Sequence, residues 1–152
     1  MEEKNKIKIY VASPLDKDKR CNLFKAVEIL RNKGYEVYNP VEHVITNAWD
    51  YPNGEWGLQV FTLDLNAIKN SDFVVALNYG RQGTSSGTTI EQGMAFMGGI
   101  KVILVEMPFT VEGDVQSLMT ANARYATVKG LEGLSEYDFE NPLPLRVDTE
   151  QK

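Results

Sequence analysis

Short runs of aliphatic and β-branched residues alternate along the chain with segments whose apolar residues recur at helical spacing. The short runs predict five buried strands, at residues 8–12, 36–38, 72–77, 101–105 and 126–128. The helical spacing predicts helices around residues 23–30, after Trp56, and around 90–97 and 115–121. Strands and helices in alternation form a parallel sheet covered by helices on both faces. We therefore predict a single α/β domain over residues 1–152.

The segments between these elements differ in length and in chemistry. Residues 39–55, which contain two prolines and a glycine, predict a long loop of the kind that often serves as a lid or binding loop. We expect the base pocket to be built from this loop and from the tail, which shows no strong period from Glu136 onward. The helix after Trp56 is expected to turn four apolar residues toward the core: Val60, Phe61, Leu65 and Ile68.

Composition narrows the classes of function. A formal net charge of −5 argues against broad binding to nucleic acid or to anionic membranes, although a helix start can still hold one phosphate. Cys21 is the only cysteine, and residues 1–6 lack the apolar core of a signal peptide, so we expect a cytoplasmic protein. His43 is the only histidine, which removes Ser–His–Asp catalysis and most zinc sites. Acid–base chemistry must then come from carboxylates, tyrosine or lysine, and we expect no metal or organic cofactor.

Glu91 is the first candidate for chemistry. It lies in the opening turn of a predicted helix, directly after a loop of glycines and hydroxyl residues at 83–89. Glutamate is common in first turns because it complements the helix dipole. However, ligands bind at this edge of a parallel sheet, and small residues let a ligand approach the backbone closely. A carboxylate there can attack an anomeric carbon, as in retaining glycosidases.

Asp64 and Tyr10 are the second and third candidates. Val60, Asp64 and Ile68 are spaced by four, so one helix face presents a carboxylate between apolar residues. Such a carboxyl either serves a structural ion pair or cap, or acts as a proton donor whose pKa burial has raised. Tyr10 lies near the end of the first strand and is either a core residue or a hydroxyl that orients Glu91.

The order and spacing of these residues resemble the nucleoside 2-deoxyribosyltransferase family over most of the chain. The resemblance is carried by five segments, at residues 8–14, 55–69, 87–93, 117–119 and 137–139. It implies a flavodoxin-like fold with a five-stranded parallel sheet. It also implies a homo-oligomer, a dimer or larger, in which Ser117 and Met119 reach into a neighbour's site.

The resemblance further implies a double-displacement reaction on a deoxynucleoside. Glu91 would attack C1′ to form a deoxyribosyl ester, and a second nucleobase would then accept the sugar. Asp64 would protonate and recognise the base, and Tyr10 would hold the nucleophile in place. The residues that match substrate-binding positions are Ser13, Ser85, Ser86, Gly87, Ser117 and Met119.

Two departures from the transferases keep other activities open. Ser85 stands where transferases usually carry a sugar-binding Asp, and Ser117 stands where many carry Asn. A related branch, the 2′-deoxynucleoside 5′-monophosphate N-hydrolases, has serine at both positions, and a hydroxyl suits a 5′-phosphate that a carboxylate would repel. Against the hydrolase, the loop at 14–19 lacks that branch's basic, glycine-rich character. A transferase in nucleotide salvage is the first hypothesis, a monophosphate hydrolase the second, and a non-catalytic nucleotide sensor the third.

Overall fold

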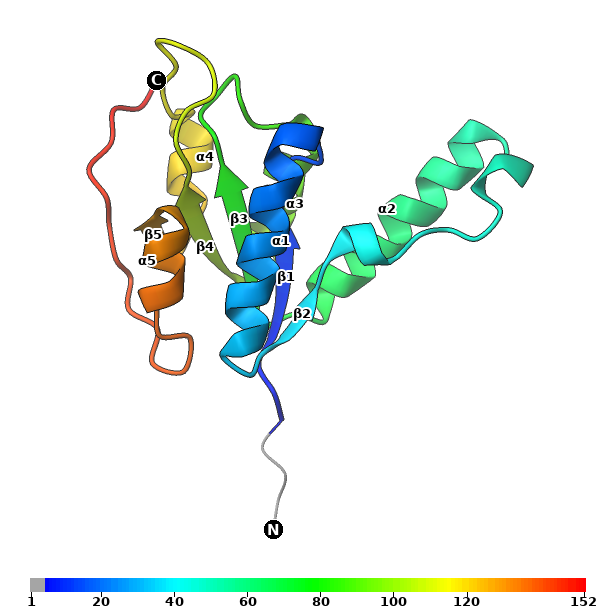
Figure 1. The fold of residues 1–152 in the computed structure, drawn as a ribbon, viewed down its shortest axis with the longest axis horizontal. Coiled ribbons are helices and arrows are strands. Elements are labelled where there is room, and N and C mark those ends of the chain that lie inside the picture. The colour runs from blue at the N-terminus through cyan, green and yellow to red at the C-terminus, as the bar shows by residue number, and fades with distance from the viewer. Residues whose placement is uncertain (1–4) are drawn as a thin grey trace.

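A computed structural model describes residues 5–152, and its centre is a five-stranded parallel sheet (Figure 1). The strands lie in the order β2-β1-β3-β4-β5, which is the flavodoxin-like order. Their bounds are β1 Lys8–Ala12, β2 Glu36–Tyr38, β3 Phe73–Asn78, β4 Lys101–Glu106 and β5 Ala126–Lys129. All five predicted strands are confirmed, because each is a short apolar run long enough to cross the sheet once.

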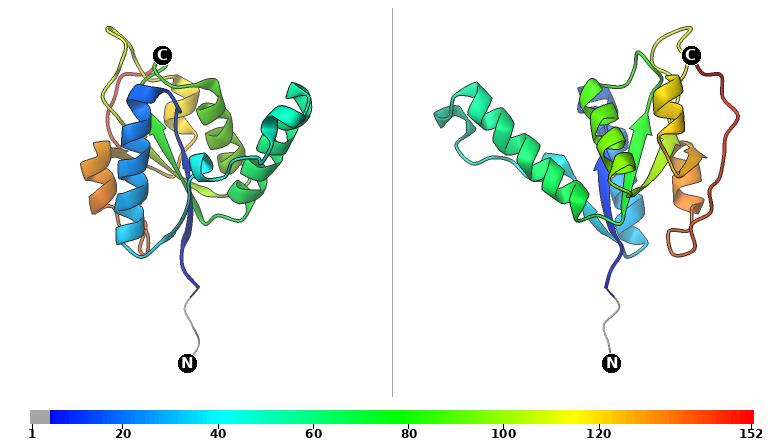
Figure 2. Two further views of the ribbon diagram at one scale, coloured as in Figure 1. Left: turned by 45° about the vertical axis from the view of Figure 1, so that its right-hand side comes forward. Right: turned by 180° about the vertical axis from the view of Figure 1, so that it is seen from behind.

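Helices cover both faces of the sheet (Figures 1 and 2). On one face lie α1 Lys17–Asn32 and α5 Gly130–Glu136, and on the other lie α2 Asn53–Lys69, α3 Ser86–Met97 and α4 Leu118–Asn122. Alternate residues of each strand point to opposite faces. On β1, for example, Ile9 and Val11 join the core beneath α1, whereas Tyr10 and Ala12 join the core beneath α2 and α3. Tyr10 therefore belongs to the face that carries α3.

Helix α2 departs from the expected packing. It begins at Asn53, before Trp56, and residues 39–52 contain two short 3-10 turns, Pro40–Glu42 and Ala48–Asp50. Of the four apolar residues expected in the core, only Ile68 is buried, and Phe61 is 49% exposed. The prediction for Phe61 is wrong because the first half of α2 projects away from the sheet, as Figure 2 shows.

Helix α5 was not predicted. It is seven residues long, so its apolar side chains are too few to show a helical period. Leu134 nevertheless packs into the core under α1, and the buried rings of Tyr137 and Phe139 follow it there. These two rings lie on the α1 face, so within one chain they cannot form a base pocket on the α3 face. The expectation that this part of the tail builds that pocket is therefore wrong for a single chain.

Candidate active site

Tyr10 and Glu91 meet on the α3 face of the sheet. The Tyr10 side chain is fully buried, and its hydroxyl donates a hydrogen bond of 3.0 Å to Oε1 of Glu91. Tyr10 comes from the central part of the sheet and Glu91 from α3, so residues 81 positions apart are joined by the fold. Glu91 lies in the second turn of α3 and not in the predicted opening turn, because the helix begins at Ser86, within the small-residue loop. The bond engages one carboxyl oxygen and leaves Oε2 for other partners.

The surroundings of Glu91 change its acidity. Burial raises the pKa of Glu91 from its ordinary value of 4.5 to about 7, the hydrogen bond from Tyr10 opposes this rise, and the charge of Asp64 adds to it. Burial also raises the pKa of the Tyr10 hydroxyl far above its ordinary range, with the charges of Glu91 and Asp64 adding to the effect. Tyr10 is therefore a neutral donor at any physiological pH, and Glu91 is partly ionised near neutrality.

Asp64 reaches the same site from α2. It is half-buried, and burial raises its pKa while the charge of His43 lowers it. No salt bridge among residues 5–152 involves Asp64, so the structural role of an ion pair does not account for it. The spacing of Asp64 and Ile68 on one helix face brings the carboxyl to the sheet, because Ile68 anchors the C-terminal half of α2.

Tyr38 and His43 lie beside this group, although the sequence pattern did not single them out as functional. Tyr38 is the register partner of Tyr10 in the parallel pair β1–β2, and the two rings stack with centroids 5.4 Å apart. The His43 ring stacks on the other side of Tyr38 at 4.0 Å. The signal in the sequence was a tyrosine in each of the first two predicted strands. It could be interpreted only once the sheet showed that these strands pair and that the two tyrosines are register partners.

A buried lysine ties the two loops at the carboxyl edge of the sheet together. Lys19 Nζ donates to the carbonyl oxygen of Gly83 at 2.6 Å and to Oδ2 of Asp16 at 3.0 Å. Gly83 is packed so closely that a Cβ there would lie 2.5 Å from the carbonyl oxygen of Tyr79. The loop that leads into α3, and hence to Glu91, is therefore held from two sides.

Four of the predicted substrate-binding residues, Ser13, Ser85, Ser86 and Gly87, lie in the loops and at the helix start along this edge of the sheet. Ser13 is half-buried after β1, and its hydroxyl donates to the Pro14 carbonyl oxygen at 2.9 Å. Ser85 precedes α3 and its hydroxyl lies 2.8 Å from Oγ1 of Thr88. Ser86 and Gly87 open α3, both exposed, and no atom lies within 4 Å of where a Gly87 Cβ would stand. Space next to the helix start is thus available to a ligand.

Ser117 and Met119 lie apart from Glu91 within the chain. Ser117 precedes α4 and lines a cavity of about 260 Å³ together with Ser86 and Thr89, while Met119 is 76% exposed. Ser86 and Thr89 lie on the side of α3 opposite Glu91, because Thr89 and Glu91 are two positions apart on a helix that turns about 100° per residue. One chain therefore does not bring Ser117 and Met119 to its own Glu91.

Gln92 of α3 connects this helix to α4. Its side chain is 1% exposed, and its Nε2 donates at 2.8 Å to the carbonyl oxygens of Thr120 and Ala123. These carbonyls lie in and just after the last turn of α4, where helical carbonyls lack intrahelical partners. The residue next to Glu91 thus anchors the helix that carries Met119.

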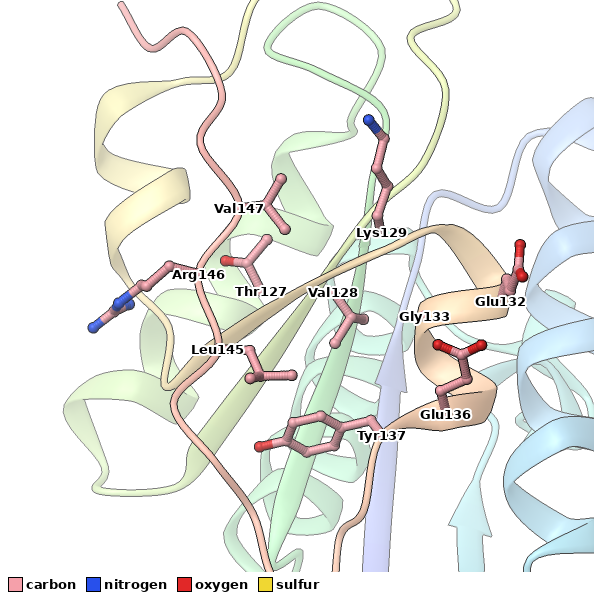
Figure 3. A pocket seen from close by; sticks show the side chains of 10 residues that line it. All are labelled: Thr127, Val128, Lys129, Glu132, Gly133, Glu136, Tyr137, Leu145, Arg146 and Val147. Atoms are coloured by element: carbon pink, nitrogen blue, oxygen red, sulfur yellow. The ribbon is translucent and has the colours of Figure 1, made fainter.

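A larger cavity, of about 580 Å³, lies elsewhere in the molecule. It is formed by β5, α5 and residues 145–147 of the tail, and Figure 3 shows an apolar floor that includes Val128 and Leu145, with Glu132 and Glu136 on the α5 side. None of the predicted site residues line it, and α5 covers the face of the sheet opposite Glu91. Size alone therefore does not identify the reactive site.

Residues 5–152 show neither a metal-binding cluster nor a membrane-spanning helix. Within this range, no cluster of three or more His, Cys, Asp and Glu side chains is arranged to hold a metal ion. In the same part of the chain, no helix combines the length and apolarity needed to cross a bilayer.

Solved structures share this arrangement of sheet and helices. A 2-deoxyribosyltransferase from Bacillus psychrosaccharolyticus is 27% identical, with a TM-score of 0.72 and coverage of 90% of this chain and 98% of that one. A conserved protein from Enterococcus faecalis V583 is 22% identical, with a TM-score of 0.68 and coverage of 87% and 96%. A CMP N-glycosidase from Clostridium botulinum is 21% identical, with a TM-score of 0.55 and coverage of 85% and 95%. The last two likenesses establish the fold alone.

Sequence comparison identifies the family. No protein with a curated function matches this sequence. The family model described as nucleoside 2-deoxyribosyltransferase, in contrast, matches residues 9–144, which include Tyr10, Asp64 and Glu91. The chain therefore belongs to the nucleoside 2-deoxyribosyltransferase family and is an enzyme that cleaves N-glycosidic bonds, either as a glycosyltransferase or as an N-glycoside hydrolase.

Proposed function

We propose that this enzyme transfers the deoxyribosyl group of a 2′-deoxynucleoside to another nucleobase through a covalent ester on Glu91. The observation that carries the proposal is the buried hydrogen bond from Tyr10 to Oε1 of Glu91, with Asp64 close enough to raise the pKa of Glu91. One carboxyl oxygen is held by the hydroxyl, and the other is free to form a bond to carbon.

The two steps balance with the groups present. In the first, Oε2 of Glu91 attacks C1′, the bond from C1′ to the base nitrogen breaks, and Asp64 gives its proton to the departing base. In the second, a nitrogen of the acceptor base attacks C1′, the ester bond to Glu91 breaks, and Asp64 takes back a proton. Inversion at C1′ in each of the two steps gives overall retention, as in retaining glycosidases.

The acidities support these roles. Glu91 must be ionised to attack, and the Tyr10 hydroxyl favours its ionised form. Asp64 must carry a proton when the base leaves, and burial raises its pKa toward values at which a carboxyl is a useful acid. The pair thus divides one proton between a nucleophile that the Tyr10 hydroxyl stabilises in its ionised form and an acid whose pKa is raised by burial.

Incubation with and without an acceptor base tests the proposal. Each deoxynucleoside and each 5′-monophosphate is supplied alone and with a free base, and products are separated by chromatography. Base exchange that requires the acceptor supports the transferase. Release of free base at the same rate without the acceptor supports hydrolysis, in which water resolves the ester. Tight nucleotide binding with no product of either kind would contradict the proposal and favour a sensor.

Replacing Tyr10 by phenylalanine should move the acid limb of the pH profile to higher pH. Loss of the hydroxyl removes the bond that lowers the pKa of Glu91, so ionisation then requires a pH higher by about one unit. The matched control is Tyr125→Phe, which removes a hydroxyl bonded to the Pro142 carbonyl oxygen away from the site. A limb of kcat/KM that stays in place in Tyr10→Phe would disprove the assigned role of Tyr10.

The hydrolase of 5′-monophosphates is the second candidate, favoured by the serines at 85 and 117. Ser85→Asp should lower the ratio of kcat/KM for a monophosphate to that for its nucleoside by about tenfold or more, since like charges repel across a short distance. Ser85→Asn is the control, because it has nearly the same shape without the charge. Aspartate is also well tolerated at the position before a helix, so folding should be unaffected. An unchanged ratio in Ser85→Asp would remove the phosphate argument.

We further propose that the active site is completed in a homo-oligomer. The face that carries Glu91 exposes large apolar side chains on three helices, among them Phe61 of α2, Met97 of α3 and Met119 of α4. Burying such a patch against another copy is favourable, and it would carry Ser117 and Met119 toward a partner's Glu91. Light scattering of the purified protein should give a mass of at least two chains.

With Cys21 as the lone cysteine, no internal disulfide is formed, which suits the cytoplasm as its site of action.

A further inference from the structure

The Tyr38 hydroxyl is an unexplained polar group at the edge of the proposed site. Its oxygen is buried and has no hydrogen-bond partner among residues 5–152. A buried hydroxyl without a partner costs free energy, and such groups in native structures generally have a reason. The ring itself is well packed between Tyr10 and His43, so packing explains the ring but not the oxygen.

The position of Tyr38 directs its hydroxyl toward the carboxylates. Tyr38 and Tyr10 are partners in a parallel pair, and their rings are within 13° of parallel, so the two side chains leave the sheet on the same face. The Tyr10 hydroxyl ends at Glu91. Tyr38 also lines one cavity with Leu63 and Ala67 of α2, the helix that carries Asp64. Burial raises the pKa of Tyr38, and the charge of Asp64, followed by that of Glu91, adds to this rise.

In the part of the chain that the structure describes, Asp64, unlike Glu91, has no side-chain group that fixes the position of its carboxyl. Glu91 has the Tyr10 hydroxyl, whereas Asp64 takes part in no salt bridge within residues 5–152. The ionisable groups that interact electrostatically with Asp64 are Tyr10 and Tyr38 from the strands, Glu91 from α3 and His43 from the loop after β2. Of these, only Tyr38 has a neutral hydroxyl donor that is not already engaged.

We propose that Tyr38 is a positioning residue whose hydroxyl donates a hydrogen bond to the carboxyl of Asp64, as Tyr10 does for Glu91. In this pairing one carboxyl oxygen of Asp64 accepts the bond from the hydroxyl, and the other is left to exchange a proton with the base. The stack of His43 on Tyr38 keeps the phenol ring from turning away. This inference rests on the proposed function, in which Asp64 is the proton donor.

A double-mutant cycle tests whether Tyr38 acts through Asp64. Tyr38→Phe keeps the ring stack and removes only the oxygen, and it should lower kcat about tenfold with KM changed by less than about twofold. In an Asp64→Asn background the same substitution should change kcat by less than about twofold, because the group it positions is no longer an acid. Tyr125→Phe should change neither constant in either background.

Two results would overturn the inference. If the effects of Tyr38→Phe and Asp64→Asn multiply, Tyr38 does not act through Asp64. If Tyr38→Phe raises KM and leaves kcat unchanged, its hydroxyl contacts the substrate instead.

A titration that needs no turnover separates this inference from the proposed function. With ¹³C-labelled aspartate, the Asp64 carboxyl carbon is followed by NMR in the wild type and in Tyr38→Phe. Loss of a hydrogen bond to the carboxylate should raise the pKa of Asp64 by about one unit. An unchanged titration disproves the pairing even in an active enzyme. A raised pKa in a protein that never releases base would keep the pairing and contradict the proposed function.

Discussion

Glu91→Gln should lower the rate of base release by about 10⁴-fold or more with every deoxynucleoside tested, because an amide cannot form the ester intermediate. Glutamine keeps the size of the side chain and can still accept the Tyr10 hydrogen bond, so the loss reflects chemistry and not packing. The rate is measured by chromatography of the released base under single-turnover and steady-state conditions. Glu136→Gln is the control, since that side chain is exposed at the end of α5 on the other face.

Trapping the covalent intermediate is a second test of Glu91 as the nucleophile. Mixing the wild type with a deoxynucleoside and no acceptor, followed by acid quenching, should yield a peptide containing Glu91 that carries one deoxyribosyl group. The adduct should be absent in Glu91→Gln. Full base release by Glu91→Gln, or an adduct on another residue, would show that the nucleophile has been assigned wrongly.

Glu91→Gln should also change the pH dependence of folding stability. The pKa of Glu91 is raised from 4.5 to about 7 by burial, so the folded wild type loses stability as the pH rises from 4.5 through 7 and the carboxyl ionises. Glutamine does not titrate, and the variant should gain stability relative to the wild type between pH 4 and pH 8, by on the order of 3 kcal/mol. Urea unfolding at the two values of pH measures the difference. An equal loss of stability in both proteins would mean that Glu91 is not buried as described.

Asp64→Asn should lower kcat by about 10²-fold to 10⁴-fold, the range typical of a lost general acid. The loss should depend on the leaving group. A deoxynucleoside whose base departs without protonation, such as an N7-methylated purine deoxynucleoside, should lose far less than its unmethylated parent. Asp72→Asn is the control, because Asp72 lies before β3 and binds the backbone N–H of Lys8 at the other end of the strands. Equal losses for the two substrates would contradict the role of Asp64 as proton donor.

The acid limb of Asp64→Asn offers an independent check on how the two carboxyls interact. The charge of Asp64 raises the pKa of Glu91, so removing it should move the acid limb of kcat/KM to lower pH. This shift is opposite in sign to that expected for Tyr10→Phe. Two substitutions that move one limb in opposite directions would identify Glu91 as the group that titrates. Shifts in the same direction would assign the limb to another residue.

The sequence by itself determined the sheet. A buried parallel strand is a short, continuous apolar run, and each such run in this chain became a strand because nothing else can bury it. It also indicated Glu91 and Asp64, since a carboxylate shortly after a small-residue loop that follows a strand, or between apolar residues on one helix face, is a local pattern. Helix α5 could not be predicted from the sequence, because seven residues are too few to display a helical period.

Only the tertiary structure decided which of these residues meet. Tyr10 and Glu91 are 81 positions apart, and their hydrogen bond exists because β1 lies beside β3 while α3 covers that face. The projection of α2, which leaves Phe61 exposed, and the pairing that stacks Tyr38 on Tyr10 likewise depend on contacts between distant segments. A period in the sequence reports which side of an element is apolar, but the strand order decides what that side faces.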